Sequence, residues 1–414
     1  MPGPVFSGGA AFQKTRWHHR SLATRRIVTR ENGQFVVATP GRSVCDNHAR
    51  VLEKIGRLRA IALGTRRGTN GVPPERTRLF PAFGLANYVA SRTLPPFRAE
   101  SFRFGLLPWF DRWVRKKLTP GDHIVSSYGY ATECFKFIRR NGGKTFIDAG
   151  NSHIDHFWEL ISEEHRRWKN PLPAFPPVWL RRSRESLAET DYVLSPSDYV
   201  TKSFLERGFK PEQILKNPYP VDLSLFKPDD QPRPKDRPLT IINTGSVSLR
   251  KGTPYLLESF RMIQKKIPQA RLLLTNVIQD DIKSVLANYG DLPIEWSPAL
   301  PHAQLAERLR SADIFVLPSL EEGLVRTACE AMACGLPAIL TPNTGANDFV
   351  TPGVSGEVVP IRDAKAIAEA VLKWADIILQ PGYQPKITID KSLLSFEHFE
   401  KTFIGQLTDL KFIE

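Results

Sequence analysis

Two glutamates stand eight positions apart in EGLVRTACEAMACG, the segment from Glu322 to Gly335. Glu330 lies among small and apolar residues, where a buried carboxylate needs hydrogen-bond donors such as the hydroxyls of a ribose. Eight helical residues span about 12 Å, comparable to the distance from a hexose across a diphosphate to a ribose. The spacing therefore fits a nucleotide sugar. The competing interpretation places Glu330 on an exposed stripe of a helix.

The turn between these glutamates offers backbone groups to an anion. Gly323 lets the backbone approach a ligand closely, and a helix is predicted to begin near Leu324 and Val325. The amides at the start of a helix bind anions because they lack partners within the helix. We therefore expect phosphate oxygens to meet the amides of Gly323, Leu324 and Val325.

A second candidate phosphate contact is GSVSLRKG, which follows the apolar run from Leu239 to Thr244. Gly245 permits a tight turn, and the adjacent cations Arg250 and Lys251 suit a diphosphate at the end of a strand. The alternative is an ordinary helix start with solvated surface charge.

Common phosphate and metal motifs are absent. The sequence has no G-x-x-x-x-G-K-[ST], no strand-linked G-x-G-x-x-G and no Asp-x-Asp pair. The four cysteines match no zinc pattern, and a site made from His153, His156 and Glu159 lacks a matching pair elsewhere. We therefore expect no metal and no cofactor, with cations and backbone amides neutralising the phosphates.

Short apolar runs alternate with helical stretches along the chain, which predicts an α/β fold with parallel sheets. Two Rossmann-like, doubly wound domains are expected to face each other across a cleft, with a C-terminal helix crossing back to the N-terminal domain. Four prolines in FKPDDQPRPKDRP mark a linker. The predicted divisions are a disordered segment 1–30, an acceptor-binding domain 31–225, a linker 226–238, a nucleotide-sugar-binding domain 239–385 and a C-terminal helical segment 386–414.

The excess positive charge lies in the N-terminal half. Residues 1–220 hold 36 Lys and Arg against 19 Asp and Glu, while the whole chain has a net charge of +14. Aromatic and basic residues interleave in residues 102–118 and 166–184, and Trp109, Phe110, Trp113 and Val114 are predicted to share one helix face. That face suits an anionic membrane surface, although the same aromatics fit packing against a sheet.

No apolar run is long enough to span a bilayer, and unpaired cysteines fit a reducing compartment. The predicted location is therefore the cytoplasm, with peripheral contact to the inner face of the membrane. Nucleic acid is not expected as a partner.

The segment EGLVRTACEAMACGLPAILTPNTGANDFVTPGVSG resembles the E-x7-E segment of the retaining GT-B glycosyltransferases of family 4. The pieces SPSDYVTKSFLERGF, KNPYPVDLSLFKP, GSVSLRKG and SADIFVLPSLEEG follow in the order of that family, so the resemblance covers residues 183–360.

The resemblance implies roles for individual residues. Glu330 corresponds to the glutamate that binds the ribose, Glu322 to the one that contacts the donor hexose, and Lys251 to a diphosphate-binding lysine. His153 stands where the family has a histidine that faces the donor sugar. Transfer with retention would follow, from a nucleotide-diphosphate sugar to a hydroxyl acceptor such as a lipid-linked or cell-envelope glycan in polysaccharide biosynthesis.

The chain also departs from the family pattern. Ser246 stands where the family has an arginine, which makes Arg250 a candidate replacement, and Val325 stands where many members have glycine. Gly41 and Arg42, after the apolar run Phe35 to Pro40, are expected on the acceptor side.

Other function classes stay open on the sequence alone. The departures from the family suit a catalytically weak or inactive GT-B protein that serves as a binding or scaffold partner. The basic character suits a nucleic-acid-binding protein, which would leave the C-terminal pattern unexplained. An epimerase or phosphorylase of related architecture is a further alternative. Neither the base, the sugar, the acceptor nor the oligomeric state follows from the sequence.

Overall fold

The computed structural model describes residues 33–41, 43–65, 69, 71–94, 96–172, 177–229, 231, 233, 234, 236–386 and 389–414. The segment 1–30 that was predicted to be disordered lies outside the described residues, and so does Arg42.

Seven parallel strands form the N-terminal sheet, in the order β3-β2-β1-β4-β5-β6-β7. Nearly all apolar and β-branched residues of the five central strands are buried, as is typical of strands covered by helices on both faces. The strands are β1 (Phe35–Thr39), β2 (Leu58–Leu63), β3 (Thr77–Leu79), β4 (His123–Ser126), β5 (Thr145–Asp148), β6 (Tyr192–Ser195) and β7 (Ile214–Lys216).

Six parallel strands form the C-terminal sheet, in the order β10-β9-β8-β11-β12-β13. In both sheets the strand order reverses beside the first strand of the sheet, and ligands of such folds bind at the carboxyl ends near that point. The strands are β8 (Thr240–Asn243), β9 (Arg271–Thr275), β10 (Ile294–Ser297), β11 (Ile314–Leu317), β12 (Ala338–Leu340) and β13 (Gly356–Val358).

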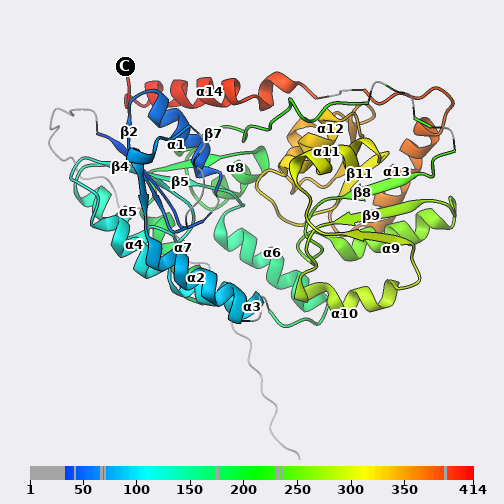
Figure 1. The fold of residues 1–414 in the computed structure, drawn as a ribbon, viewed down its shortest axis with the longest axis horizontal. Helices are drawn as coiled ribbons and strands as arrows, with labels where there is room; N and C mark the ends of the chain where they lie inside the picture. The colour runs from blue at the N-terminus through cyan, green and yellow to red at the C-terminus, as the bar shows by residue number, and fades with distance from the viewer. Residues whose placement is uncertain are drawn as a thin grey trace, which may run out of the picture. The chain divides into compact units, whose positions relative to one another are not determined.

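Helices connect and cover the strands (Figure 1). In the N-terminal half they are α1 (Cys45–Lys54), α2 (Pro81–Thr93), α3 (Pro96–Gly105), α4 (Leu107–Arg115), α5 (Thr132–Arg140), α6 (Ile154–Arg167), α7 (Pro177–Ala188) and α8 (Asp198–Leu205). In the C-terminal half they are α9 (Thr253–Gln264), α10 (Lys283–Leu286), α11 (His302–Arg310), α12 (Arg326–Ala333), α13 (Ala364–Ile378) and α14 (Phe396–Asp409). None of the described helices is long and apolar enough to cross a bilayer.

The α/β class and the two Rossmann-like domains are as the sequence predicted. The helical region over 280–289 consists of the four residues of α10 flanked by two 3₁₀ turns, Asp280–Ile282 and Ala287–Tyr289. Ile282 and Tyr289 in these turns are buried, and so is Val285 in α10.

The C-terminal helix returns to the N-terminal sheet, as expected. The Asn217 side chain donates to the backbone oxygen of Phe399 at 2.9 Å, and the Gln406 side chain donates to the backbone oxygen of Lys216 at 2.9 Å. Beyond α14, the ring of Phe412 packs edge-on against Phe146 at 5.4 Å. Aromatic packing of this kind stabilises a domain beyond simple burial, so α14 ties the end of the chain to the N-terminal core.

The prediction that α4 presents its apolar face to a membrane is wrong. Phe110 and Val114 are fully buried in the N-terminal core, and Trp113 stacks on Phe80 with ring centroids 5.0 Å apart. Asp111 on the same helix is also buried, where it accepts hydrogen bonds from the start of α5. The amphipathic pattern of α4 therefore serves packing on the sheet, and Trp109 is the member of the predicted face that stays exposed, at 44%.

Candidate active site

Three loops meet at the carboxyl ends of β5, β8 and β11. The β8 loop (residues 244–252) brings Arg250 and Lys251, the β11 loop (residues 318–325) brings Glu321 and Glu322, and the β5 loop (residues 149–153) adds groups from the N-terminal domain. The backbone amide of Leu320 donates to the backbone oxygen of Arg250 at 2.9 Å, which joins the two C-terminal loops.

Glu322 holds both cations of the β8 loop. One guanidinium nitrogen of Arg250 lies 2.8 Å from Oε1 of Glu322, and the ammonium of Lys251 pairs with the same oxygen. Arg250 also donates to the backbone oxygen of Glu321 at 2.8 Å. The two cations that were predicted to bind a diphosphate thus converge on the carboxylate that was predicted to contact the hexose.

The charges of this cluster depend on one another. Burial raises the pKa of Glu322, but Arg250 and Lys251 outweigh burial and leave that pKa below its ordinary value. Burial lowers the pKa of Lys251, and Glu322 opposes that effect. Arg250 and Lys251 therefore favour the ionised form of Glu322 inside the protein, and Glu322 in turn favours the charged form of Lys251.

Gly252 gives the β8 loop its course. Its φ is +67°, in the left-handed region that favours glycine, and a Cβ there would overlap the backbone oxygen of Pro318. The backbone amide of Gly245 donates to the side chain of Asn243 at 2.9 Å, and Ser246 is partly buried beside it. Arg250 therefore contacts Glu322 from near the end of the β8 loop, whereas Ser246 lies near the start of that loop.

Glu321 is a site residue that the sequence did not distinguish from its neighbour. Its carboxylate is fully buried and accepts hydrogen bonds from Asn151 Nδ2 at 2.9 Å, from the amide of Ser152 at 2.8 Å and from Ser152 Oγ at 2.9 Å. Burial raises the pKa of Glu321, while Arg250 acts in the opposite direction. A carboxylate of the C-terminal domain thus joins the β5 loop of the N-terminal domain.

Gly323 lets the backbone approach another part of the protein closely, where the sequence predicted an approach to a ligand. A Cβ at Gly323 would overlap the backbone oxygen of Gly150, and Ser197 Oγ donates to the backbone oxygen of Gly323 at 2.7 Å. Glycine at position 323 therefore allows the backbones of the two domains to meet beside the charged cluster.

The start of α12, where an anion site was predicted, differs from the prediction in where the helix begins and in one backbone amide. The helix begins at Arg326, Val325 gives it no side-chain cap, and the amide of Val325 donates to the backbone oxygen of Thr344 at 3.2 Å. The Val325 amide is therefore engaged within the protein. A binding role for the amides of Gly323 and Leu324 stays a prediction.

Glu330 lies on α12 and is buried, with 6% of its surface exposed. Burial raises its pKa to about 7, although Arg326 acts in the opposite direction. Its Oε2 atom has no hydrogen-bond partner among the described residues. A buried carboxylate oxygen without a donor is costly, so Glu330 has the character of a group that accepts hydrogen bonds from a ligand.

His153 follows β5 and forms the N-cap of α6. Its Nδ1 accepts a hydrogen bond from the amide of Asp155 at 3.2 Å, and its ring packs edge-on against Phe204 and Phe209. Burial lowers its pKa to about 4, so the ring is neutral at pH 7. These contacts explain His153 as a capping and core residue, and its role toward a donor sugar stays a prediction.

No group of three or more His, Cys, Asp or Glu side chains within the described ranges is arranged to hold a metal ion. Glu159 pairs with Arg207 instead of completing a site with His153 and His156. On the acceptor side, Gly41 accepts a hydrogen bond from Thr39 Oγ1 at 2.9 Å, and a Cβ there would meet open space.

The C-terminal domain carries the signature of a known family. Residues 227–377 match the family described as "Glycosyl transferases group 1". Similar proteins are named as glycosyltransferases. One is the putative colanic acid biosynthesis glycosyltransferase WcaL of Salmonella typhimurium, 27% identical over 45% of this chain and 48% of that protein. The chain thus spans about half the length of this relative.

A second glycosyltransferase relative is matched over more of the chain. The GDP-mannose-dependent alpha-(1-6)-phosphatidylinositol monomannoside mannosyltransferase of Mycolicibacterium smegmatis is 26% identical over 64% of this chain and 71% of that protein.

Solved structures of GT-B glycosyltransferases share the fold. Sucrose-phosphate synthase from Thermosynechococcus elongatus aligns with a TM-score of 0.63 and 21% identity, over 92% of this chain and 99% of that one. Anabaena HepE in complex with UDP and glucose aligns with a TM-score of 0.61 and 13% identity, over 91% and 99%. At these identities the likeness establishes the architecture of two Rossmann-like domains.

Proposed function

We propose that this protein transfers a glycosyl unit from a nucleotide-diphosphate sugar to a hydroxyl acceptor, with retention of configuration. The observation that carries the proposal is that Glu322 forms ion pairs with both Arg250 and Lys251. Eight residues further on, the buried Glu330 has one carboxylate oxygen without a hydrogen-bond partner among the described residues. The match to the glycosyltransferase family and the nucleotide-sugar names of relatives support the same activity.

The charged cluster suits the departure of a diphosphate. As the bond from the anomeric carbon to the phosphate oxygen breaks, negative charge grows on the diphosphate, and Arg250 and Lys251 stabilise it. Glu322, released from the cations, accepts hydrogen bonds from the hexose. The acceptor oxygen bonds to the same face of the anomeric carbon, and its proton passes to the leaving phosphate oxygen.

A panel of nucleotide sugars tests this function. We expect one donor class to raise the melting temperature, since a ligand at 100 times its Kd stabilises the folded state by about 2.7 kcal/mol. The same donor should release nucleoside diphosphate when an acceptor is present, and product analysis gives the configuration. If no donor shifts the melting temperature or releases nucleoside diphosphate, the protein is a scaffold and the proposal is wrong.

Glu330 predicts how donor binding depends on pH. With a pKa raised to about 7, the carboxyl group is mostly protonated at pH 6 and mostly ionised at pH 8. The ionised form is the stronger acceptor for ribose hydroxyls, so donor affinity is expected to rise about tenfold from pH 6 to pH 8. Calorimetric titration measures this profile. Glu330→Gln should flatten it, and an unchanged profile in that variant would contradict the role of Glu330.

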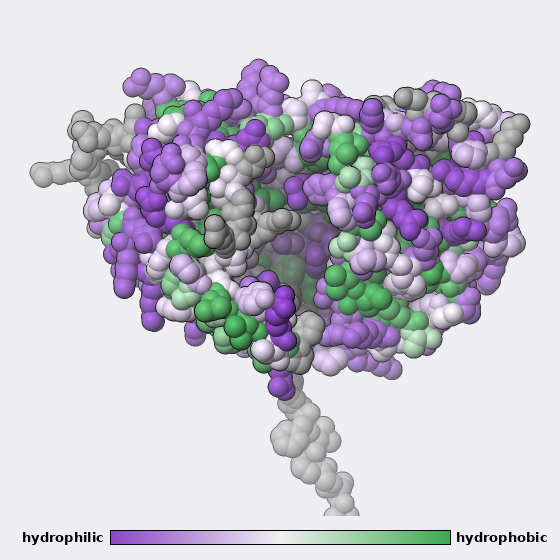
Figure 2. Space-filling view, viewed as in Figure 1, coloured by the Kyte–Doolittle hydropathy of each residue, from purple (hydrophilic) through white to green (hydrophobic). Residues whose placement is uncertain are grey.

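For the acceptor, we propose a lipid-linked or cell-envelope glycan met at an anionic membrane surface. Leu85, Tyr88 and Val89 form an exposed apolar stripe on α2, with 65%, 54% and 49% of their surfaces exposed. Figure 2 shows hydrophobic side chains gathered where α2 lies, and a second hydrophobic group on the C-terminal half of the same face. Arg92 on the same helix is exposed and lies over the ring of Tyr88. An apolar stripe beside a basic residue is typical of peripheral membrane contact. The function assay, repeated with acceptors in anionic vesicles, tests this part: no gain over soluble acceptors would remove it.

A further inference from the structure

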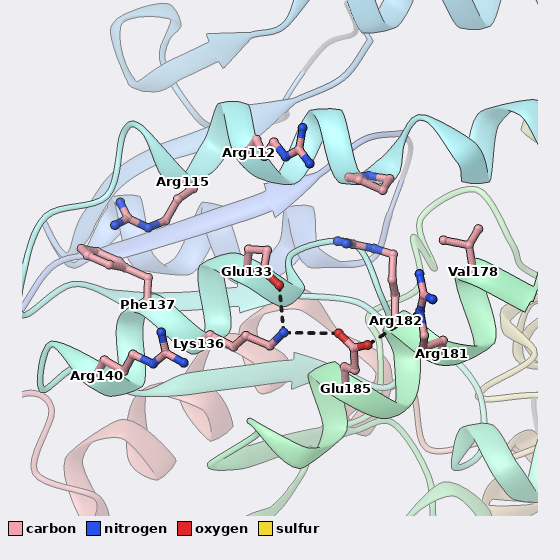
Figure 3. A pocket seen from close by; sticks show the side chains of 11 residues that line it. Arg112, Arg115, Glu133, Lys136, Phe137, Arg140, Val178, Arg181, Arg182 and Glu185 are labelled. Carbon is pink, nitrogen blue, oxygen red and sulfur yellow. Dashed lines mark hydrogen bonds and ion pairs between the residues drawn. The ribbon is translucent and has the colours of Figure 1, made fainter.

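A basic groove lies among α4, α5 and α7, on helices that contribute nothing to the candidate active site (Figure 3). Its volume is about 630 Å³. Two carboxylates, Glu133 and Glu185, line it together with six cations, which are Arg112, Arg115, Lys136, Arg140, Arg181 and Arg182. The lining therefore carries a large excess of positive charge.

The carboxylates of the groove are already engaged. Lys136 lies 2.9 Å from Glu133 and 3.3 Å from Glu185, and Arg181 lies 3.8 Å from Glu185. These pairs leave no lining carboxylate for the other cations. Any further neutralisation must come from outside the groove.

Three guanidinium groups remain without an acidic partner in the part of the chain that the structure describes: those of Arg112, Arg115 and Arg140. Arg112 and Arg140 are exposed, while the guanidinium of Arg115 lies 3.3 Å from the ring centroid of Phe137. Like charges gathered at one hollow repel each other and attract a counter-anion. Planar guanidinium groups bind phosphate through paired hydrogen bonds, so a phosphate group suits this hollow.

The walls of the groove are fixed in place by buried polar contacts. Arg182 is buried and lies 2.6 Å from Oδ2 of Asp111, and it donates to the backbone oxygen of Gly129 at 2.9 Å. Asp111 also accepts from the amides of Glu133 and Cys134 at the start of α5, at 2.8 Å and 3.1 Å. One buried pair thus joins the three helices, and a preformed site loses little entropy when a ligand binds.

We propose that this groove binds a phosphate-bearing anion, at a site separate from the candidate donor site. The ligand is either a soluble phosphate compound or the phosphate of an anionic lipid headgroup. The proposal does not depend on the transfer reaction, because none of the residues that carry it belongs to the cluster around Glu322.

Titration calorimetry with inorganic pyrophosphate at low salt tests the site. We expect the double variant Arg112→Ser and Arg140→Ser to bind at least about tenfold more weakly, because each lost charge-assisted hydrogen bond is worth roughly a factor of ten in affinity. The matched control, Lys266→Ser and Arg271→Ser, removes two exposed cations from the C-terminal domain and should bind like the original protein. Lys251→Ala should keep the groove binding, which separates it from the donor site.

Vesicles distinguish the two sources of phosphate. The same variants are sedimented with vesicles of phosphatidylglycerol in phosphatidylcholine and, for comparison, with vesicles of phosphatidylcholine alone. Loss of vesicle binding in the groove variant alone indicates a lipid headgroup, whereas an effect on pyrophosphate alone indicates a soluble ligand. The proposal is wrong if the groove variant and the control behave alike in both measurements while their unfolding curves match.

Discussion

Glu322→Gln is expected to lower turnover by about 10²- to 10³-fold, the usual effect of removing one group that stabilises a transition state electrostatically. In the same variant the affinity for the nucleoside diphosphate product should rise or stay constant. The reason is that Glu322 occupies Arg250 and Lys251 in this structure, so a diphosphate must compete with its carboxylate. A neutral glutamine competes less.

Steady-state kinetics and calorimetry measure the two effects separately. Glu369→Gln is the matched control, since Glu369 is exposed on α13 and pairs with Lys365 on its own helix. The variant at Glu322 should lose stability, by about 1 to 3 kcal/mol, because Arg250 and Lys251 lose the carboxylate that they share, and the Arg250 side chain keeps, among the described residues, only its contacts with Glu321. Nucleoside diphosphate should restore it. Unchanged turnover, or product affinity that falls with turnover, would contradict the proposed competition.

The sequence predicted the repeated order of strands and helices because the apolar runs are short, β-branched and bounded by turn residues. The run IFVLPS, Ile314 to Ser319, contains β11. The three-residue strands β3, β7, β12 and β13 were missed, since their pairing rests on neighbours elsewhere in the chain. A strand of three residues is too short to show the alternation of apolar and polar residues that identifies a strand from sequence.

The site residues also divide into those with local signals in the sequence and those whose partners lie far along the chain. The spacing of Glu322 and Glu330 is local and visible in the sequence, and so is the adjacency of Arg250 and Lys251. The role of Glu321 is not visible, because its partners Asn151 and Ser152 lie about 170 positions away. The apolar face of α4 was misassigned for a related reason: its periodicity is the same whether a sheet or a membrane covers it.

Glu321→Leu is expected to lower the free energy of unfolding by about 3 to 5 kcal/mol, the cost of breaking a buried charged network. The carboxylate accepts three hydrogen bonds from the β5 loop, so its loss leaves Asn151 Nδ2, Ser152 N and Ser152 Oγ without their acceptor. Urea unfolding measures the change. Glu357→Leu is the matched control, because Glu357 is half-buried and makes a single ion pair, with the exposed Lys373.

A double-mutant cycle assigns the loss to the contact between the domains. Asn151→Ala should cost about 1 to 3 kcal/mol alone and much less in the Glu321→Leu background, since its partner is already gone. The double variant Glu321→Gln with Asn151→Asp swaps the donor and the acceptor of this hydrogen bond. It should therefore be more stable than the single variant Glu321→Gln. Additive losses would mean that the two residues act independently. The contribution of Glu321 to the free energy of unfolding would then come from contacts within the C-terminal domain.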